Sequence, residues 1–164
     1  MQNRKKHKWL KYLVAVFLIL ILVVIIITPL WLASIIMTGE RQTLDEAIKW
    51  QSERYDTSFY NDLDKTNYTV DGFKGYKLHV QLLKNPNKTD RYVILTHGNT
   101  DNRMGSLKYV PMYIDLGYNC IISDLRGHGE NEKTFTTYGI LEGEDLLSLI
   151  KDTRERYPEI TKHD

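Results

Sequence analysis

The feature that most constrains the fold of this chain is a long uncharged run near its amino terminus. Residues 12–39 contain no Asp, Glu, Lys or Arg, and most of them are aliphatic. A helix rises about 1.5 Å per residue, so roughly 20 residues cross the ~30 Å hydrocarbon layer of a bilayer. Trp9 and Trp31 stand near the two ends of such a span, where aromatic side chains favour the membrane interface. The run therefore predicts a transmembrane anchor over residues 12–37.

A cleaved signal peptide is the alternative explanation of the uncharged run. The apolar region of a signal peptide normally has about 7 to 15 residues and ends at a small-residue cleavage site of the Ala-x-Ala type. Here residues 13–27 are continuously apolar, the uncharged run continues beyond them, and no such site follows. An uncleaved signal anchor is the better interpretation, and the lipid bilayer is the expected partner.

Basic residues are concentrated before the anchor. Of the 22 lysine and arginine residues, five precede residue 12 and 17 follow it, whereas all 21 acidic residues follow it. By the positive-inside rule, residues 1–11 form a cytoplasmic segment, and the rest of this single-pass membrane protein lies outside the cytoplasm. The outer part is slightly acidic, so the composition gives no indication of nucleic-acid binding. The five basic residues are Arg4, Lys5, Lys6, Lys8 and Lys11.

Two short apolar runs further along the chain predict neighbouring strands of a parallel sheet. Residues 92–95 and 119–124 are rich in β-branched side chains and lack polar alternation, which is typical of strands covered by helices on both faces. Residues 106–116 between them have the apolar spacing of a helix, which completes a β-α-β unit. Polar residues and glycines follow both strands, at the edge where open α/β sheets place their sites.

The single cysteine, Cys120, falls within the second apolar run. One cysteine cannot form an intramolecular disulfide, and a catalytic thiol needs exposure and a lowered pKa. We therefore interpret Cys120 as a small core residue.

The stretch between the anchor and the first strands predicts a short helix and a linker. Residues 43–46 have the Thr-x-x-Glu pattern of a capping box, and Leu44, Ala47, Ile48 and Gln51 form one narrow face of a helix that continues to about residue 54. This helix packs on the domain, lies along the bilayer surface or serves as a plain spacer. Residues 58–65 are polar and predict a loop, so we assign residues 38–66 to a membrane-proximal helix and linker. The remaining predicted elements are strands over residues 68–70 and 77–83 and a last helix over residues 140–157.

Four motifs follow one another in the second half of the chain. They are His97-Gly98-Asn99-Thr100, Leu116-Gly117-Tyr118, Asp124-Leu125-Arg126-Gly127-His128-Gly129-Glu130 and Tyr138-Gly139-Ile140-Leu141-Glu142-Gly143-Glu144-Asp145. In this order and spacing they resemble the amino-terminal half of an α/β-hydrolase of the serine-hydrolase, S33-peptidase-like kind. The resemblance covers roughly residues 67–158, and we assign residues 67–164 to this half-domain. It implies an α/β fold with strands one to four and helices A and B, a sheet of order 1-2-4-3-5, and hydrolysis of esters or amides by full-length relatives.

The resemblance also implies which residues surround the site. His97, Gly98 and Asn99 correspond to the oxyanion-hole loop, in which the backbone N–H of Asn99 is one donor to the developing oxyanion. From the residues alone, the same segment also fits a simple strand end and turn. The loop after the fourth strand is expected to shape the pocket or to support it structurally, without a role in proton transfer. Its residues are Asp124, Arg126, Gly127, His128 and Gly129.

The catalytic residues of the resembling family are not found in this sequence. No Gly-x-Ser-x-Gly occurs, and the family's nucleophile would be expected just past Asp164, with the triad acid and histidine later still. We therefore expect an amino-terminal part that is truncated before the nucleophile, is inactive alone, and pairs with the missing carboxyl-terminal half or self-associates. The alternative is a non-catalytic membrane-anchored binding module that uses the same half-fold.

A two-metal phosphoesterase site is the rival interpretation of residues 97–101, because His, Asn and Asp can all ligate metals. Such a site needs further carboxylate and histidine ligands on other strand ends, and an upstream Asp-x-His is missing. No Walker loop or Gly-x-Gly-x-x-Gly pattern occurs either. The sequence predicts no metal, nucleotide or other cofactor, and it does not identify the substrate.

Overall fold

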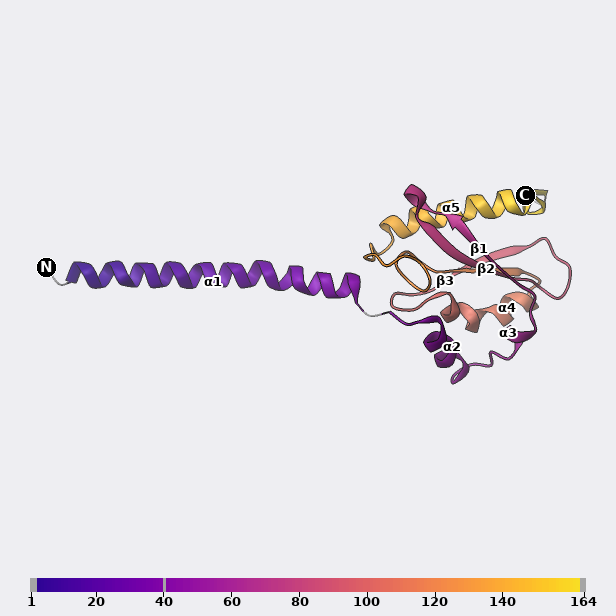
Figure 1. Cartoon of the computed structure of the whole chain (residues 1–164), viewed down its shortest axis with the longest axis horizontal. Helices are drawn as coiled ribbons and strands as arrows, with labels where there is room; N and C mark the ends of the chain where they lie inside the picture. Colours follow the sequence, from indigo (N-terminus) through magenta and orange to yellow (C-terminus); the bar gives the residue numbers. More distant parts are fainter. Residues whose placement is uncertain (1–2, 40, 163–164) are drawn as a thin grey trace. The chain divides into compact units, whose positions relative to one another are not determined.

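The computed structural model describes residues 3–39 and 41–162 of the chain. The chain divides into two compact units, Met1–Gly39 and Glu40–Asp164 (Figure 1). Residues 1 and 2 of the predicted cytoplasmic segment, residue 40 of the predicted linker and residues 163–164 of the predicted half-domain lie outside the described residues.

The first unit is one helix, α1 (Asn3–Thr38). Its segment Lys8–Thr38, of 31 residues, is long and apolar enough to span a membrane, and its large apolar side chains are exposed. A signal sequence near the amino terminus can also form an apolar helix of this kind. The choice of an uncleaved anchor and its orientation therefore stay predictions.

The second unit is organised around a four-stranded mixed sheet with the strand order β1-β2-β4-β3. β1 runs antiparallel to β2 and β2 antiparallel to β4, whereas β3 is parallel to β4 with Val93 opposite Cys120. The predicted order of the first four strands is confirmed. The strands are β1 (Lys65–Asp71), β2 (Lys77–Leu83), β3 (Tyr92–Thr96) and β4 (Asn119–Ser123).

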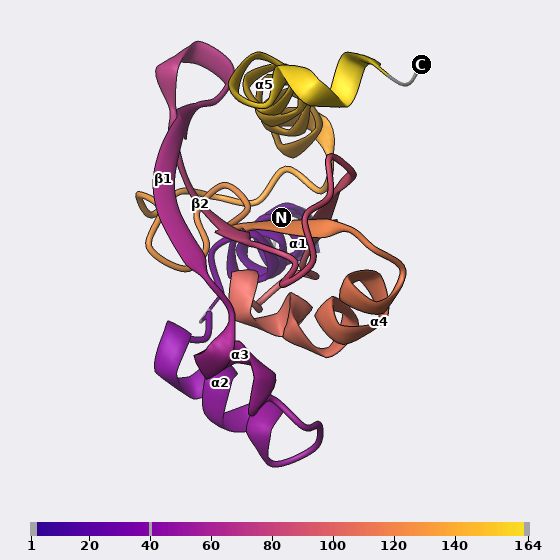
Figure 2. The ribbon, with the colours of Figure 1, turned by 90° about the vertical axis from the view of Figure 1, so that its right-hand side faces the viewer.

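Helices cover both faces of the sheet, as Figure 2 shows. On one face, Cys120 and Ile122 of β4 belong to the same buried core as Leu107. On the other face, Ile121 belongs to a second core with Leu149. Alternate side chains of β4 therefore join two cores. The helices of the first face are α2 (Leu44–Ser52), α3 (Phe59–Asp62), the 3₁₀ helix η2 (Arg103–Tyr109) and α4 (Val110–Asp115), and α5 (Ile140–Arg156) covers the second.

The two parallel strands differ in burial. All five residues of β4 are buried, and burial raises the pKa of the Cys120 thiol to about 12, so Cys120 is confirmed as a core residue. In β3 only Leu95 is buried, so the expectation of a strand covered on both faces is wrong there. The reason is the strand order, because within residues 41–162 no strand pairs with the edge of β3 that faces away from β4.

Helix α2 is part of the core of the second unit. The predicted capping box is present, because Thr43 Oγ1 accepts from the N–H of Glu46 at 3.3 Å and the Glu46 carboxylate accepts from the N–H of Thr43 at 2.8 Å. Ala47 and Gln51 are each only 1% exposed, and Gln51 donates to the carbonyl oxygen of Gly105 at 3.3 Å. Among the three alternatives for this helix, the structure therefore selects packing on the domain.

Two local expectations are corrected by the structure. Residues 58–65, expected to form a loop, contain α3 and the first residue of β1. The helix expected over residues 106–116 begins at Arg103 as η2 and becomes α-helical only in α4. It begins early because the side chain of Asn102 caps it, accepting from the N–H of Met104 at 3.0 Å.

Candidate functional site

The loops that follow β3 and β4 lie at the same edge of the sheet, and His97 joins them. Its ring is buried, and its Nε2 accepts from the backbone N–H of Leu125 at 2.9 Å. Because Nε2 is an acceptor, the proton of the neutral ring is on Nδ1, which lies 2.7 Å from the carbonyl oxygen of Gly98. Burial lowers the pKa of His97 below its ordinary value, so the ring is neutral near pH 7. His97 thus holds the candidate oxyanion loop to the loop after β4.

The three residues after His97 are exposed. No described residue accepts a hydrogen bond from the N–H of Asn99, while its side-chain amide donates to the hydroxyl of Tyr138 at 3.2 Å. Thr100 has a φ of 67°, and a Cβ at Gly98 would meet no atom within 4 Å. An N–H without an acceptor, in an exposed residue beside open space, is suited to an oxyanion donor. The assignment of this loop stays a prediction.

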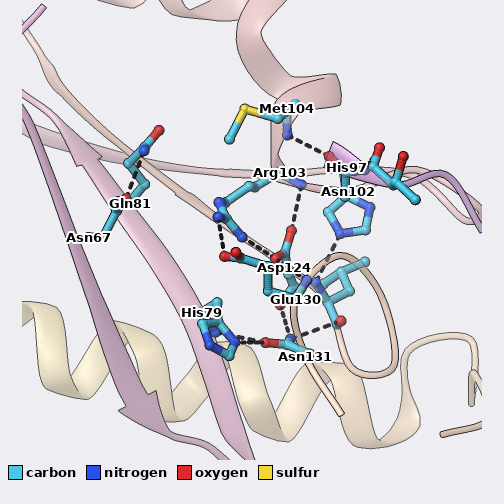
Figure 3. A network of polar contacts seen from close by, with 12 residues as sticks. Asn67, His79, Gln81, His97, Asn102, Arg103, Met104, Asp124, Glu130 and Asn131 are labelled. Atoms are coloured by element: carbon cyan, nitrogen blue, oxygen red, sulfur yellow. Dashed lines mark hydrogen bonds and ion pairs between the residues drawn. The ribbon is translucent and has the colours of Figure 1, made fainter. Parts of the chain in front are cut away.

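Asp124 anchors the loop that follows β4, as Figure 3 shows. Its buried carboxylate accepts from the N–H of Arg103 at 2.8 Å and from the N–H of Glu130 at 3.0 Å, and it forms an ion pair with the Arg103 guanidinium. Asn131 donates to the carbonyl oxygen of Asp124 at 2.8 Å and accepts from the N–H of His79 at 2.8 Å. Both carboxylate oxygens are engaged within the chain, which favours a structural role.

Two glycines of this loop are required by close packing. Gly129 has a φ of 55°, and a Cβ there would lie 2.2 Å from the carboxylate carbon of Asp124. Gly127 has a φ of 72°, and a Cβ there would lie 2.4 Å from Nη1 of Arg41 and 2.5 Å from the carbonyl oxygen of Thr134. Both the positive φ and the neighbouring atoms exclude a side chain at these positions.

Arg126 connects the same loop to α5 and to the turn between β1 and β2. Its guanidinium donates twice to the carboxylate of Asp145, at 2.9 and 2.8 Å, and lies 4.0 Å from the ring centroid of Tyr76. Asp145 also accepts from the N–H of Phe73 at 2.8 Å. Both charged side chains are nearly buried, so each compensates the other.

His128 is 1% exposed, and its ring centroid lies 5.2 Å from that of His97 in an edge-to-face arrangement. Its Nδ1 lies 2.8 Å from the carbonyl oxygen of Arg126, and its Nε2 has no hydrogen-bond partner in the described part of the chain. Burial lowers the pKa of His128, so this ring is neutral near pH 7. These contacts favour the expected loop role over that of a catalytic base.

Three residues that hold these loops are not predicted from the sequence. Arg103 has a usable signal, because a charged residue at the start of a core-packed helix needs a buried partner. Asn102 has one as well, since Asn is a favoured residue just before a helix. Arg41 has no local signal, because the partners of its guanidinium lie 86 to 95 positions later in the chain.

The surroundings of the candidate oxyanion loop include a groove of about 640 Å³ at Thr100, lined also by Arg41 and by Trp50 of α2. No group of three or more His, Cys, Asp or Glu side chains that could hold a metal occurs among the residues that the structure describes.

Comparison with known proteins identifies the fold to which these loops belong. No protein-family model matches the chain. The uncharacterized protein YqkD of Bacillus subtilis strain 168 is 31% identical over an alignment of 128 residues that covers 73% of this chain and 41% of YqkD. Two crystal forms of the Pyrococcus furiosus esterase Pf2001 are each 28% identical, with TM-scores of 0.54 and 0.55 over 62% of this chain and 39% and 40% of the esterase. The second unit has an α/β-hydrolase-like fold.

This fold agrees with the strand order β1-β2-β4-β3 and with the helices on both faces of the sheet. The chain spans 41% of the length of YqkD and 39% to 40% of the length of Pf2001. The similarity therefore establishes the fold, and the activity is a separate inference.

Proposed function

We propose that the chain is the membrane-anchored amino-terminal part of a serine hydrolase that cleaves esters or amides outside the cytoplasm. The observation that carries this proposal is the link made by His97 between the two site loops. It lies beside the exposed residue Asn99, whose backbone N–H has no acceptor among the described residues. The similarity to the esterase Pf2001 supports the class of reaction.

Hydrolysis of an ester or amide by a serine hydrolase passes through a tetrahedral intermediate with a negatively charged oxygen. A preorganised backbone N–H stabilises this charge, and loss of one such donor typically lowers kcat about 10²–10³-fold. His97 is suited to fix the donor, because both of its ring nitrogens contact backbone atoms of the two loops. The reacting carbonyl of the substrate would occupy the open space beside Gly98.

The chain alone is proposed to be inactive, because its 164 residues contain no Gly-x-Ser-x-Gly. The remainder of the hydrolase would add a strand along the open edge of β3. After α5, the 3₁₀ helix η3 (Pro158–Lys162) follows, and Tyr92 at the start of β3 donates to Glu159 at 2.8 Å and stacks on Tyr157. A strand that followed η3 would thus start beside β3 and run parallel to it, as a β-α-β crossover requires.

Membrane attachment is the second part of the proposal. The segment Lys8–Thr38 has the length and composition of a membrane span, and five basic residues precede residue 12. This asymmetry supports a single-pass protein with a cytoplasmic amino terminus and an extracytoplasmic second unit.

The proposal is tested by joining the chain to the part of YqkD that lies carboxyl-terminal to the matched 128 residues. The joined protein is expected to hydrolyse p-nitrophenyl esters and to react with a fluorophosphonate, whereas the chain alone does neither. The matched control replaces the fluorophosphonate-labelled serine with alanine. A joined protein that unfolds cooperatively and shows neither reaction contradicts the proposal. So does labelling of the chain alone that disappears when one of its own serines is replaced.

A non-catalytic binding module is the second candidate function. It is favoured by the open edge of β3 and by the exposed side chains of Tyr109, Met112 and Leu116, because exposed strand edges and apolar patches mark interaction sites. This alternative predicts that the joined protein folds and remains without hydrolytic activity.

A further inference from the structure

Residues 41–43, which we name the strap, connect to the candidate oxyanion loop just before α2. The backbone N–H of Gln42 donates to the carbonyl oxygen of Thr100 at 3.0 Å. The buried side-chain amide of Asn102 donates to the carbonyl oxygens of Gln42 and Thr43, at 3.1 and 3.0 Å. Helix α2 begins directly after the strap, and the capping box of Thr43 fixes the carboxyl-terminal end of the strap.

Arg41 attaches the strap to the loop after β4. Its guanidinium donates to the carbonyl oxygens of Gly127 and Thr134, the latter at 2.9 Å. It also donates to the hydroxyl of Thr136 at 2.8 Å. Residues 124–139 contain no helix or strand, so side-chain contacts such as these set the shape of the loop. A planar guanidinium offers five donors in fixed directions, which a lysine ammonium cannot reproduce.

The backbone geometry of both loops supports the contacts that the strap makes with them. At Gly127, a Cβ would lie 2.4 Å from Nη1 of Arg41, so only a glycine at this position leaves room for the guanidinium. On the other loop, Thr100 has a φ of 67°, a strained conformation that persists only where surrounding contacts enforce it. The hydrogen bond from Gln42 to Thr100 is such a contact.

We propose that Arg41 is a positioning residue for the backbone N–H of Asn99. Arg41 holds the loop after β4 to the strap, and the strap holds the carbonyl group of Thr100, the neighbour of Asn99. Attachment of both loops to one short backbone segment sets the direction of the Asn99 N–H relative to the loop after β4. The catalytic meaning of this link rests on the proposed function, whereas the link itself is measurable without catalysis.

The link is tested by NMR spectroscopy of the full chain, isotopically labelled and held in detergent micelles. Arg41→Ala is expected to shift the amide signal of Asn99 and to raise the hydrogen-exchange rate of the Gln42 amide about tenfold, with unchanged exchange in β4. Thr136→Val removes one acceptor at similar size and is expected to shift the same signals less. Arg54→Ala removes an exposed arginine beyond the end of α2, and this control leaves them unchanged.

Two NMR outcomes overturn the proposal. Changes confined to residues 127–136 would mean that Arg41 holds only its own loop. Faster exchange throughout β4 in Arg41→Ala, with no selective shift of Asn99 in Thr136→Val, would mean a general structural role.

Activity of the joined hydrolase gives the catalytic readout. Arg41→Ala is expected to lower kcat about tenfold with little change in KM, and Arg41→Lys is expected to recover part of the loss. An active joined protein with an unchanged kcat overturns the positioning role. If the joined protein proves inactive, the NMR result still decides whether the strap links the loops, so the two failures are distinguishable.

Discussion

The ring of His97 accepts a hydrogen bond from the backbone N–H of Leu125 at 2.9 Å, so a side chain at the end of β3 holds the loop that follows β4. This bond exists only while Nε2 lacks a proton. Protonation would turn the acceptor into a donor that faces another donor, and burial opposes the new charge as well. The proton affinity of one imidazole is therefore coupled to the contact between two loops.

We expect the free energy of unfolding of the second unit to fall as the pH is lowered from about 7 to about 5.5. Burial lowers the pKa values of His97 and His128 from 6.5 in the folded chain. The stabilisation is complete above 6.5 and is lost as the pH falls toward the folded pKa values, because the unfolded chain takes up protons first. The variant His97→Gln keeps a hydrogen-bond acceptor in the side chain but has no group that titrates in this range. It should therefore reduce the pH dependence of the free energy of unfolding. Urea titrations at several pH values measure it, and identical slopes for both proteins contradict the prediction.

Removal of one charge from the buried Arg126–Asp145 pair is expected to destabilise the second unit strongly. Arg126→Met leaves the carboxylate of Asp145 buried without its partner, at a cost of about 3–5 kcal/mol. The additional change Asp145→Leu should recover part of this loss. Lys77→Met in the exposed pair with Asp71 is the matched control and should cost less than about 1 kcal/mol. Chemical denaturation compares the variants, and equal costs for Arg126→Met and Lys77→Met would refute the argument.

Two glycines of the site loops should respond differently to alanine. At Gly129 the positive φ alone costs of the order of 1–3 kcal/mol, and the new Cβ would also press on the carboxylate of Asp124, which Arg103 holds in place. At Gly98 a Cβ meets no atom within 4 Å, so Gly98→Ala should change the free energy of unfolding by less than about 0.5 kcal/mol. Thermal unfolding of the two variants provides the comparison. A large loss in Gly98→Ala would show that the space beside this residue is not open.

The open edge of β3 predicts that the second unit is marginally stable or self-associating when produced alone. An unpaired strand edge is a template for further pairing, and Tyr109, Met112 and Leu116 leave apolar surface exposed. We expect residues 40–164 to elute as oligomers in size-exclusion chromatography, and Leu116→Lys to reduce the association. The carboxyl-terminal part of YqkD, supplied in trans, should raise solubility. A monomer that unfolds cooperatively with about 5 kcal/mol or more would instead support the binding-module alternative.

Reporter fusions after Met37 should place the second unit outside the cytoplasm. The five basic residues that precede residue 12 set this orientation, so replacement of Arg4, Lys5, Lys6 and Lys8 with neutral residues should weaken it. A reporter that is active in the cytoplasm with the unmodified chain contradicts the orientation. Recovery of a protein that lacks residues 1–37 would identify α1 as a cleaved signal sequence instead.

Elements with a strong local pattern could be predicted from the sequence. The run that forms β4, with Cys120 inside it, and the capping box at Thr43 depend on neighbouring residues, and both are present as expected. The burial of β3 could not be predicted in the same way, because it depends on which strand lies along its far edge. The early start of η2 depends on Asn102, which also bonds to backbone 59 and 60 positions earlier.

The sequence motifs predicted where the site loops lie, but they do not include the side chains that hold these loops in place. Asp124 and Arg126 could be assigned structural roles, but their partners Arg103 and Asp145 lie on η2 and α5. Arg41 is the extreme case, since its bond to Thr136 joins residues 95 positions apart. Contacts of this kind follow from the fold as a whole, so no local pattern identifies them.

The buried thiol of Cys120 can report how often the folded second unit opens. It is the single cysteine among 164 residues, it is fully buried in β4, and burial raises the pKa of its thiol to about 12. An alkylating reagent therefore reaches a reactive thiolate only after β4 separates from the helices that cover it. The rate at which such a reagent modifies Cys120 measures how often the sheet comes apart, in detergent or in a native membrane, without any introduced label.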